Sequence, residues 1–311
     1  MRSNHRRQLA LLALSMALTS GPACLSSANR GDDSGRGKPE PYVPLAPEGP
    51  ETIGFFLARF DRSLVQWSEL KLGSSSTRDQ KTLRLLEENM QERARKRRDE
   101  LVAELEGSVP VNRRIAAAAL GFTHDPSVLG PLLASLPDPD PEVAQKTLLA
   151  LGVLALPETP LGGILQRLRN DPDPWTRNNA AFALLAIARA GSTASELAEG
   201  CRAALSDGEP GVRAQCASTL GVLADPDSVQ RLSELLLDES NLVALAAATA
   251  LARIGRQHAV QKGTVGRALA SALDPVRADR RIQLLGALRW LSAMDLGSDS
   301  GPWLSWAHKL P

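Results

Sequence analysis

The sequence predicts an all-α protein, an α-solenoid of about five to six helix pairs preceded by one amphipathic helix and one long charged helix. Three observations predict this fold class. Apolar runs recur at intervals of 31, 33, 36 and 31 residues, alanine and leucine dominate while aromatic residues make up only 4 %, and acid–proline steps separate the runs. A unit of this length cannot bury its own apolar face, so neighbouring units must stack on one another.

Residues 1–23 have the features of an export signal. A positive "MRSNHRR" precedes the apolar "QLALLALSMALTS", which is too short to span a bilayer comfortably. The following "GPAC" resembles the lipobox of bacterial lipoproteins, whose cysteine becomes the lipidated first residue of the mature chain. This resemblance implies lipidation of Cys24 and a lipid anchor in the bacterial cell envelope. A soluble periplasmic or secreted protein and an uncleaved anchor are the alternatives.

Residues 24–50 follow as a tether rich in Gly, Ser, Pro and charge. Such a segment cannot bury enough apolar surface to order itself. Its expected r.m.s. reach is about 30 Å, which suits a lipid anchor that holds a folded domain off a membrane.

Residues 51–108 are expected to form a helical N-terminal segment. An apolar stripe at helical spacing first predicts an amphipathic helix that packs on the rest of the protein, with docking on a membrane surface as the alternative. Its members are Ile53, Phe56, Leu57, Phe60, Leu64 and Trp67. A long charged helix over Thr77–Gly107 then carries acidic and basic residues in equal number, which indicates pairing along a solvated face. The alternatives for this helix are an anionic docking patch and a role in envelope assembly.

Residues 109–311 are expected to form the repeat domain. Five apolar runs align on one leucine, and a small residue stands four positions before it in every run. The aligned leucines are Leu120, Leu151, Leu184, Leu220 and Leu251, and a sixth run aligns loosely at Leu285 or Leu288. A second apolar segment follows each run, which predicts helix–turn–helix units.

The two "DPDP" steps, at residues 138–141 and 171–174, are interpreted as helix punctuation. Proline presets φ at a helix start, and an acid there accepts hydrogen bonds from free backbone N–H groups. A metal loop is the rival interpretation, but no oxygen-ligand spacing of the EF-hand kind surrounds these acids.

The run "DGEPGVRAQCASTLGVLADPDSVQRLSELLLD" resembles the short HEAT-like repeat, the type also found in phycobilisome lyases. The resemblance covers roughly residues 110–290 and is specific for fold rather than for function. It implies that second helices line the concave surface, where exposed side chains would bind a partner. We expect that surface to include Gln166, Arg167, Arg202 and Glu234, with plain solvation as the alternative.

No catalytic or metal-binding constellation is found in the sequence. His124, His258 and His308 lie far apart, and the His-Glu pairs with which HEAT-like deoxyhypusine hydroxylase binds iron do not occur. Walker, G-x-S-x-G and C-x-x-C motifs do not occur either. We therefore expect no cofactor and no metal, and the balance of 36 Lys+Arg against 35 Asp+Glu argues against a nucleic-acid partner.

Cys201 and Cys216 stand nearly equidistant from the turn expected near Gly208. Antiparallel packing would bring them face to face, so we hypothesise a disulfide in an oxidising location, with two buried thiols as the alternative. At the other end of the domain, Trp290, Trp303 and Trp306 are interpreted as a cap that closes the open end of the solenoid.

These features favour a non-catalytic HEAT-like scaffold that is tethered to the bacterial envelope and binds protein partners. The alternative is a lyase-like or other enzyme-accessory repeat protein that acts on a bound cofactor or substrate protein. An enzyme would need a deep pocket with converging ionisable groups, whereas a scaffold needs a broad polar face.

Overall fold

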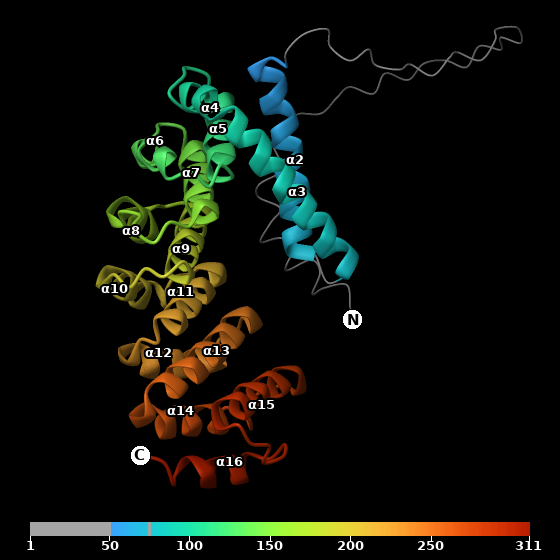
Figure 1. The fold of residues 1–311 in the computed structure, drawn as a ribbon. Helices are drawn as coiled ribbons and strands as arrows, with labels where there is room; N and C mark the ends of the chain where they lie inside the picture. Colours follow the sequence, from blue (N-terminus) through green and yellow to red (C-terminus); the bar gives the residue numbers. More distant parts are fainter. Residues whose placement is uncertain (1–50, 74–75) are drawn as a thin grey trace, which may run out of the picture. The chain divides into compact units, whose positions relative to one another are not determined.

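A computed structural model describes residues 51–73 and 76–311 (Figure 1). The signal peptide expected over residues 1–23, and Cys24 with its tether to residue 50, lie outside the described residues. The described residues form fifteen α-helices, three short 3₁₀ helices and no strand. Within the same ranges, no helix is both long and apolar enough to cross a membrane. The chain divides into two compact units, one ending at Glu88 and one spanning Asn89–Pro311.

The first unit contains α2 (Ile53–Gly73) and the beginning of α3 (Thr77–Lys96). The apolar stripe expected on α2 is buried from Phe56 to Trp67, which confirms the amphipathic helix. The Trp67 indole donates a hydrogen bond of 2.9 Å to Glu87 on α3. Lys71 pairs with the same carboxylate at 2.9 Å, so polar contacts join the two helices within this unit.

The long charged helix expected over Thr77–Gly107 is instead two helices. Arg97 separates α3 from α4 (Arg98–Leu105), because its ψ of 20° leaves the helical range and its N–H bonds to the Ala94 carbonyl three residues back. In the second unit, the basic residues around this break bind acids and carbonyl groups. Arg95 donates to the Thr123 carbonyl at 2.8 Å, and Arg98 contacts Asp125 at 2.7 Å.

Six helix pairs follow α4 and confirm the predicted solenoid. The first helices of the pairs form one layer and the second helices form another (Figure 1). The first layer consists of α5 (Pro110–Gly121), α7 (Pro141–Leu154), α9 (Pro174–Arg189), α11 (Pro210–Leu223), α13 (Asn241–Gln257) and α15 (Ala278–Ser292). The second layer consists of α6 (Leu129–Ala134), α8 (Gly162–Asn170), α10 (Ser195–Ala204), α12 (Val229–Glu234), α14 (Ala259–Ser271) and α16 (Ser300–Ala307). The 3₁₀ helices η2 (Pro126–Val128), η3 (Pro226–Ser228) and η4 (Leu235–Leu237) flank α6 and α12.

The first layer packs closely because small residues face one another along it. A Cβ added to Gly121 would lie 2.6 Å from the Ala150 Cα, and one added to Gly221 would lie 2.6 Å from the Ala250 Cα. The aligned leucines before these glycines, Leu120 and Leu220, are fully buried. Close backbone approach therefore joins α5 to α7 and α11 to α13.

The "DPDP" steps lie at the junctions between helix pairs, and the structure confirms the punctuation interpretation. Pro141 and Pro174 occupy the first turns of α7 and α9, where a missing N–H costs nothing. The second acid of each step is the N-cap: Asp140 accepts from the Glu142 N–H at 3.0 Å, and Asp173 accepts from the Thr176 N–H at 2.8 Å.

In three junctions the first acid has another role, which was not predicted from the sequence. An arginine from the preceding first-layer helix binds it with two parallel hydrogen bonds, and we call each such pair a junction clamp. The clamps are Arg113–Asp138, Arg177–Asp207 and Arg213–Asp238. Each clamp arginine also donates to backbone carbonyls in the junction before its own helix. One side chain thus holds two successive junctions at a set spacing.

The C-terminal end is closed by α16. Trp303 is fully buried and donates to the Gly297 carbonyl at 3.0 Å, while Trp306 lies against Gly266 of α14. The cap interpretation is therefore confirmed for these two tryptophans and wrong for Trp290. Trp290 is 47 % exposed, because it stacks at the surface under the Arg256 guanidinium, 4.4 Å from its ring centre.

Candidate functional site

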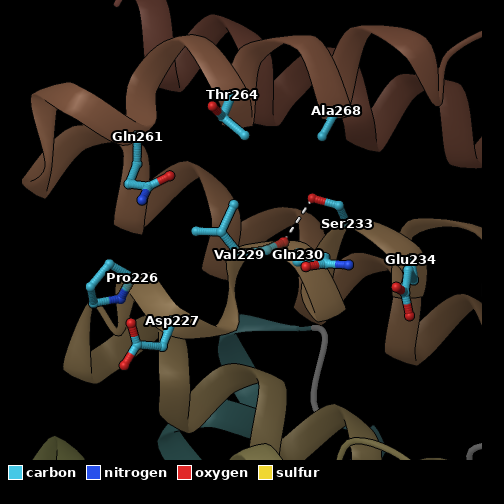
Figure 2. A pocket seen from close by; sticks show the side chains of 9 residues that line it. All are labelled: Pro226, Asp227, Val229, Gln230, Ser233, Glu234, Gln261, Thr264 and Ala268. Atoms are coloured by element: carbon cyan, nitrogen blue, oxygen red, sulfur yellow. Dashed lines mark hydrogen bonds between the residues drawn. The ribbon is translucent and has the colours of Figure 1, made fainter.

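The candidate site is a groove in the second layer, between α12 and α14 (Figure 2). It has a volume of about 730 Å³ and opens widely to solvent. Side chains of η3 and α12 form one side, and side chains of α14 form the other. The lining residues are Pro226, Asp227, Val229, Gln230, Ser233, Glu234, Gln261, Thr264 and Ala268.

Two amides and two hydroxyls are among the six polar side chains that line this groove. Within the part of the chain that the structure describes, the side chains of Gln230 and Gln261 make no hydrogen bond, so their donors and acceptors face solvent. Ser233 is partly used, because its hydroxyl donates to the Val229 carbonyl at 2.8 Å (Figure 2). The groove therefore offers hydrogen bonds on both of its sides.

The two carboxylates of the groove do not converge. Figure 2 shows Asp227 and Glu234 on opposite sides of Gln230. Each also has a basic neighbour outside the groove: Asp227 lies 3.5 Å from Arg202, and Glu234 pairs with Arg231. This spacing suits separate contacts along a surface, whereas acid–base catalysis needs both groups around one reacting atom.

The four residues expected on the binding surface lie on three second-layer helices, and only Glu234 lines the groove. Gln166 of α8 is exposed to solvent. Arg167 is half-buried, because it binds Asp171 at 2.9 Å and also donates to the Leu136 carbonyl. Arg202 is likewise engaged, at 2.6 Å from Asp225. The two arginines thus connect parts of the solenoid instead of facing solvent freely.

Cys201 and Cys216 are brought together, as antiparallel packing predicts. They lie on α10 and α11, which pack against each other, and both side chains are fully buried. The structure describes both as free thiols rather than as a disulfide. Among residues 51–73 and 76–311, no group of three or more His, Cys, Asp or Glu side chains is arranged to hold a metal ion.

The groove residues on α14 were not predicted from the sequence. A signal was present, since Gln261, Thr264 and Ala268 follow one another at helical spacing, as do Val229, Gln230, Ser233 and Glu234. Only the stacking of α12 beside α14 places these two faces on opposite sides of one groove.

Comparison with known families decides what kind of repeat this is. The model of HEAT repeats matches residues 98–185, 161–252 and 198–289, which together cover more than half of the chain. The chain belongs to the HEAT-repeat family. No curated protein matches it. HEAT repeats generally mediate protein binding, through the extended surfaces that stacked helix pairs create.

Several solved structures are similar to this HEAT-repeat protein. A designed armadillo repeat protein has 19 % identity and a TM-score of 0.48, over 62 % of this chain and 98 % of the designed one. Human deoxyhypusine hydroxylase in complex with glycerol has 20 % identity and a TM-score of 0.37, over 93 % and 97 % of the two chains. The complex of CpcE and CpcF of phycocyanin lyase from Nostoc sp. PCC7120 has 20 % identity and a TM-score of 0.38, over 87 % and 100 %.

Proposed function

We propose that this HEAT-repeat protein is a non-catalytic scaffold that binds a protein partner through its second layer and is held at the bacterial cell envelope by a lipid on Cys24. The observation that carries the binding role is the groove between α12 and α14. It is wide and open, and its Gln230 and Gln261 amides make no hydrogen bond with the described residues.

Protein binding fits this groove better than chemistry does. Polypeptide partners present backbone N–H and C=O groups, and glutamine amides can donate to and accept from them. An enzyme site typically encloses its substrate and brings ionisable groups together. The openness of the groove and the separation of Asp227 from Glu234 support the scaffold.

The envelope location is supported by the sequence of residues 1–50. A positive n-region, an apolar h-region and small residues lead to Cys24, and a chain of low hydrophobicity follows. A lipid on Cys24 together with a tether of about 30 Å reach would leave the HEAT-repeat domain free to meet partners near the membrane.

Affinity capture from membranes with the full chain tests the binding role. A Gln230→Arg variant places a long charged side chain in the groove, and a Gln283→Arg variant makes the same change at an exposed position of α15 in the first layer. We expect a partner that wild type and Gln283→Arg enrich equally and that Gln230→Arg loses by at least about tenfold, because a misplaced charge at an interface costs well over 1 kcal/mol. Equal capture by both variants would contradict the groove assignment. Enrichment of a cofactor-bearing protein that the chain alters covalently would favour the lyase-like alternative.

A Cys24→Ala variant tests the anchor separately. We expect wild type to sediment with membranes and to incorporate a labelled fatty acid, and Cys24→Ala to do neither. Membrane association of Cys24→Ala at the wild-type level would exclude anchoring through this residue, whatever the groove binds.

A further inference from the structure

Cys201 and Cys216 are two nucleophilic side chains that lie away from the groove. Cys201 lies on α10, the second helix of the third pair, and Cys216 lies on α11, the first helix of the fourth. Both side chains are fully buried. The neighbouring Cys201 side chain, followed by burial, raises the pKa of the Cys216 thiol well above its usual value. Both sulfur atoms therefore belong to buried thiols on two helices that pack against each other.

The repeat register explains why these two positions meet. Cys216 stands four residues before the aligned Leu220, in the column that Thr147 occupies in the second pair. Thr147 also faces the preceding second-layer helix, because its hydroxyl lies 2.7 Å from that of Ser135, the residue that follows α6. In the second pair this column therefore points across the junction toward the preceding second-layer helix. Cys201 occupies on α10 the fully buried position that Leu132 occupies on α6, and α10 packs against α11, which carries Cys216.

We propose that Cys201 and Cys216 form an intramolecular disulfide that ties α10 to α11 when the chain folds in the presence of a disulfide oxidant such as glutathione disulfide. One thiolate attacks the oxidant and releases one glutathione, and the second thiolate then attacks the mixed disulfide and releases the other. The two protein thiols lose two protons and two electrons in total, and glutathione disulfide takes them up as two glutathione molecules. The bridge is independent of what the groove binds.

Burial decides when the bridge forms and how long it lasts. A fully buried thiol does not meet an oxidant in the native state, so the exchange takes place during folding or during a local opening of α10. Once formed, the bridge is shielded from reductants in the same way. It also closes a short loop across the junction that the Arg177–Asp207 clamp already holds, so it removes freedom mainly from the unfolded chain.

Peptide mapping of the full chain tests the bridge directly. A Cys24→Ala variant leaves Cys201 and Cys216 as the remaining cysteines, and trypsin separates them into residues 190–202 and 214–231. After refolding with reduced and oxidised glutathione, alkylation and non-reducing digestion, we expect one linked species containing both peptides. We also expect the oxidised protein to melt roughly 5–10 °C above the same protein after reduction.

Two outcomes would overturn the proposal. One is recovery of both peptides fully alkylated, or each carrying glutathione, after refolding with excess glutathione disulfide. The other is a bridge that links two chains, seen as a reducible dimer. Cys201→Ser and Cys216→Ser variants serve as controls, since neither can give the linked peptide, and the mapping of the Cys24→Ala chain remains decisive even if a serine variant fails to fold.

Discussion

Removing the guanidinium of Arg213 should destabilise the repeat domain far more than removing an exposed arginine. Arg213 makes two hydrogen bonds of 2.9 Å with Asp238, and it donates to the carbonyls of Asp207 and Gly208 at 2.8 and 3.2 Å. The two charged side chains are only 9 % and 8 % exposed. An Arg213→Ala change therefore leaves a nearly buried carboxylate and two carbonyls without this partner.

The expected cost follows from that burial. Breaking a buried ion pair by deleting one partner typically costs about 3–5 kcal/mol, because the remaining charge stays desolvated. Asp238 keeps one hydrogen bond, from the Ser240 N–H at 2.8 Å, so we expect a loss near the lower end, about 3 kcal/mol. Arg213→Lys keeps the charge but cannot form two parallel bonds, and it should lose about half as much.

Urea unfolding followed by circular dichroism measures the loss. Hydrogen exchange in α11 and α13 should be read alongside it, because a stack of repeats can open in parts. Arg231→Ala is the matched control, since Arg231 pairs with Glu234 in solvent, with side chains 44 % and 52 % exposed. It should change stability by less than about 0.5 kcal/mol. A loss below 1 kcal/mol for Arg213→Ala, or equal losses for both variants, would refute the role assigned to the clamps.

The remaining predictions use the same unfolding measurements. Gly221→Ala should lower the free energy of unfolding by about 1–3 kcal/mol, because the new Cβ meets backbone atoms. Gly286→Ala on the open face of α15 should raise it by about 0.5–1 kcal/mol through helix propensity. Equal effects of the two variants would show that α11 and α13 can separate. Ala224→Gly should gain about 0.5–1 kcal/mol, because Ala224 ends α11 at a φ of 52° that glycine adopts more readily; a loss would contradict this. Hydrogen bonds from Arg98 and from a backbone N–H lower the pKa of Asp125 from 3.8 to about 2. Its contribution to the free energy of unfolding is therefore complete above about pH 4 and is lost as the pH falls through 2. Melting temperatures should accordingly fall more steeply from pH 5 to pH 2 in wild type than in Asp125→Asn, and parallel curves would contradict the assignment.

Much of the fold is predictable from the sequence because one unit is repeated. The aligned leucines and the small residues before them recur in the first five first-layer helices, α5 to α13, and each recurrence strengthens the same prediction. The break at Arg97 is not predictable in this way. No proline or glycine marks it, and the helix ends there through local backbone geometry.

The groove is less predictable, because it depends on what the stacking of the second layer leaves uncovered. Sequence periodicity gives the exposed face of α12, but not which residues of α14 lie opposite it. The clamps are an intermediate case. Arg113, Arg177 and Arg213 each stand seven residues before an aligned leucine, which is a readable signal, but their acidic partners lie 25 to 30 residues further along the chain.

The second helix pair shows why Arg167 belongs to the architecture rather than to the binding surface. The position that carries the clamp arginine in the first, third and fourth pairs is Ala144 in this pair, so it cannot bind Asp171 in the usual way. Arg167 reaches the same carboxylate from α8 at 2.9 Å and donates to the Leu136 carbonyl in the junction before. It thereby joins the same two junctions that a clamp arginine would join. Since this role occupies its guanidinium, the proposed partner contact rests on the groove amides of Gln230 and Gln261, whose side chains make no hydrogen bond with the described residues.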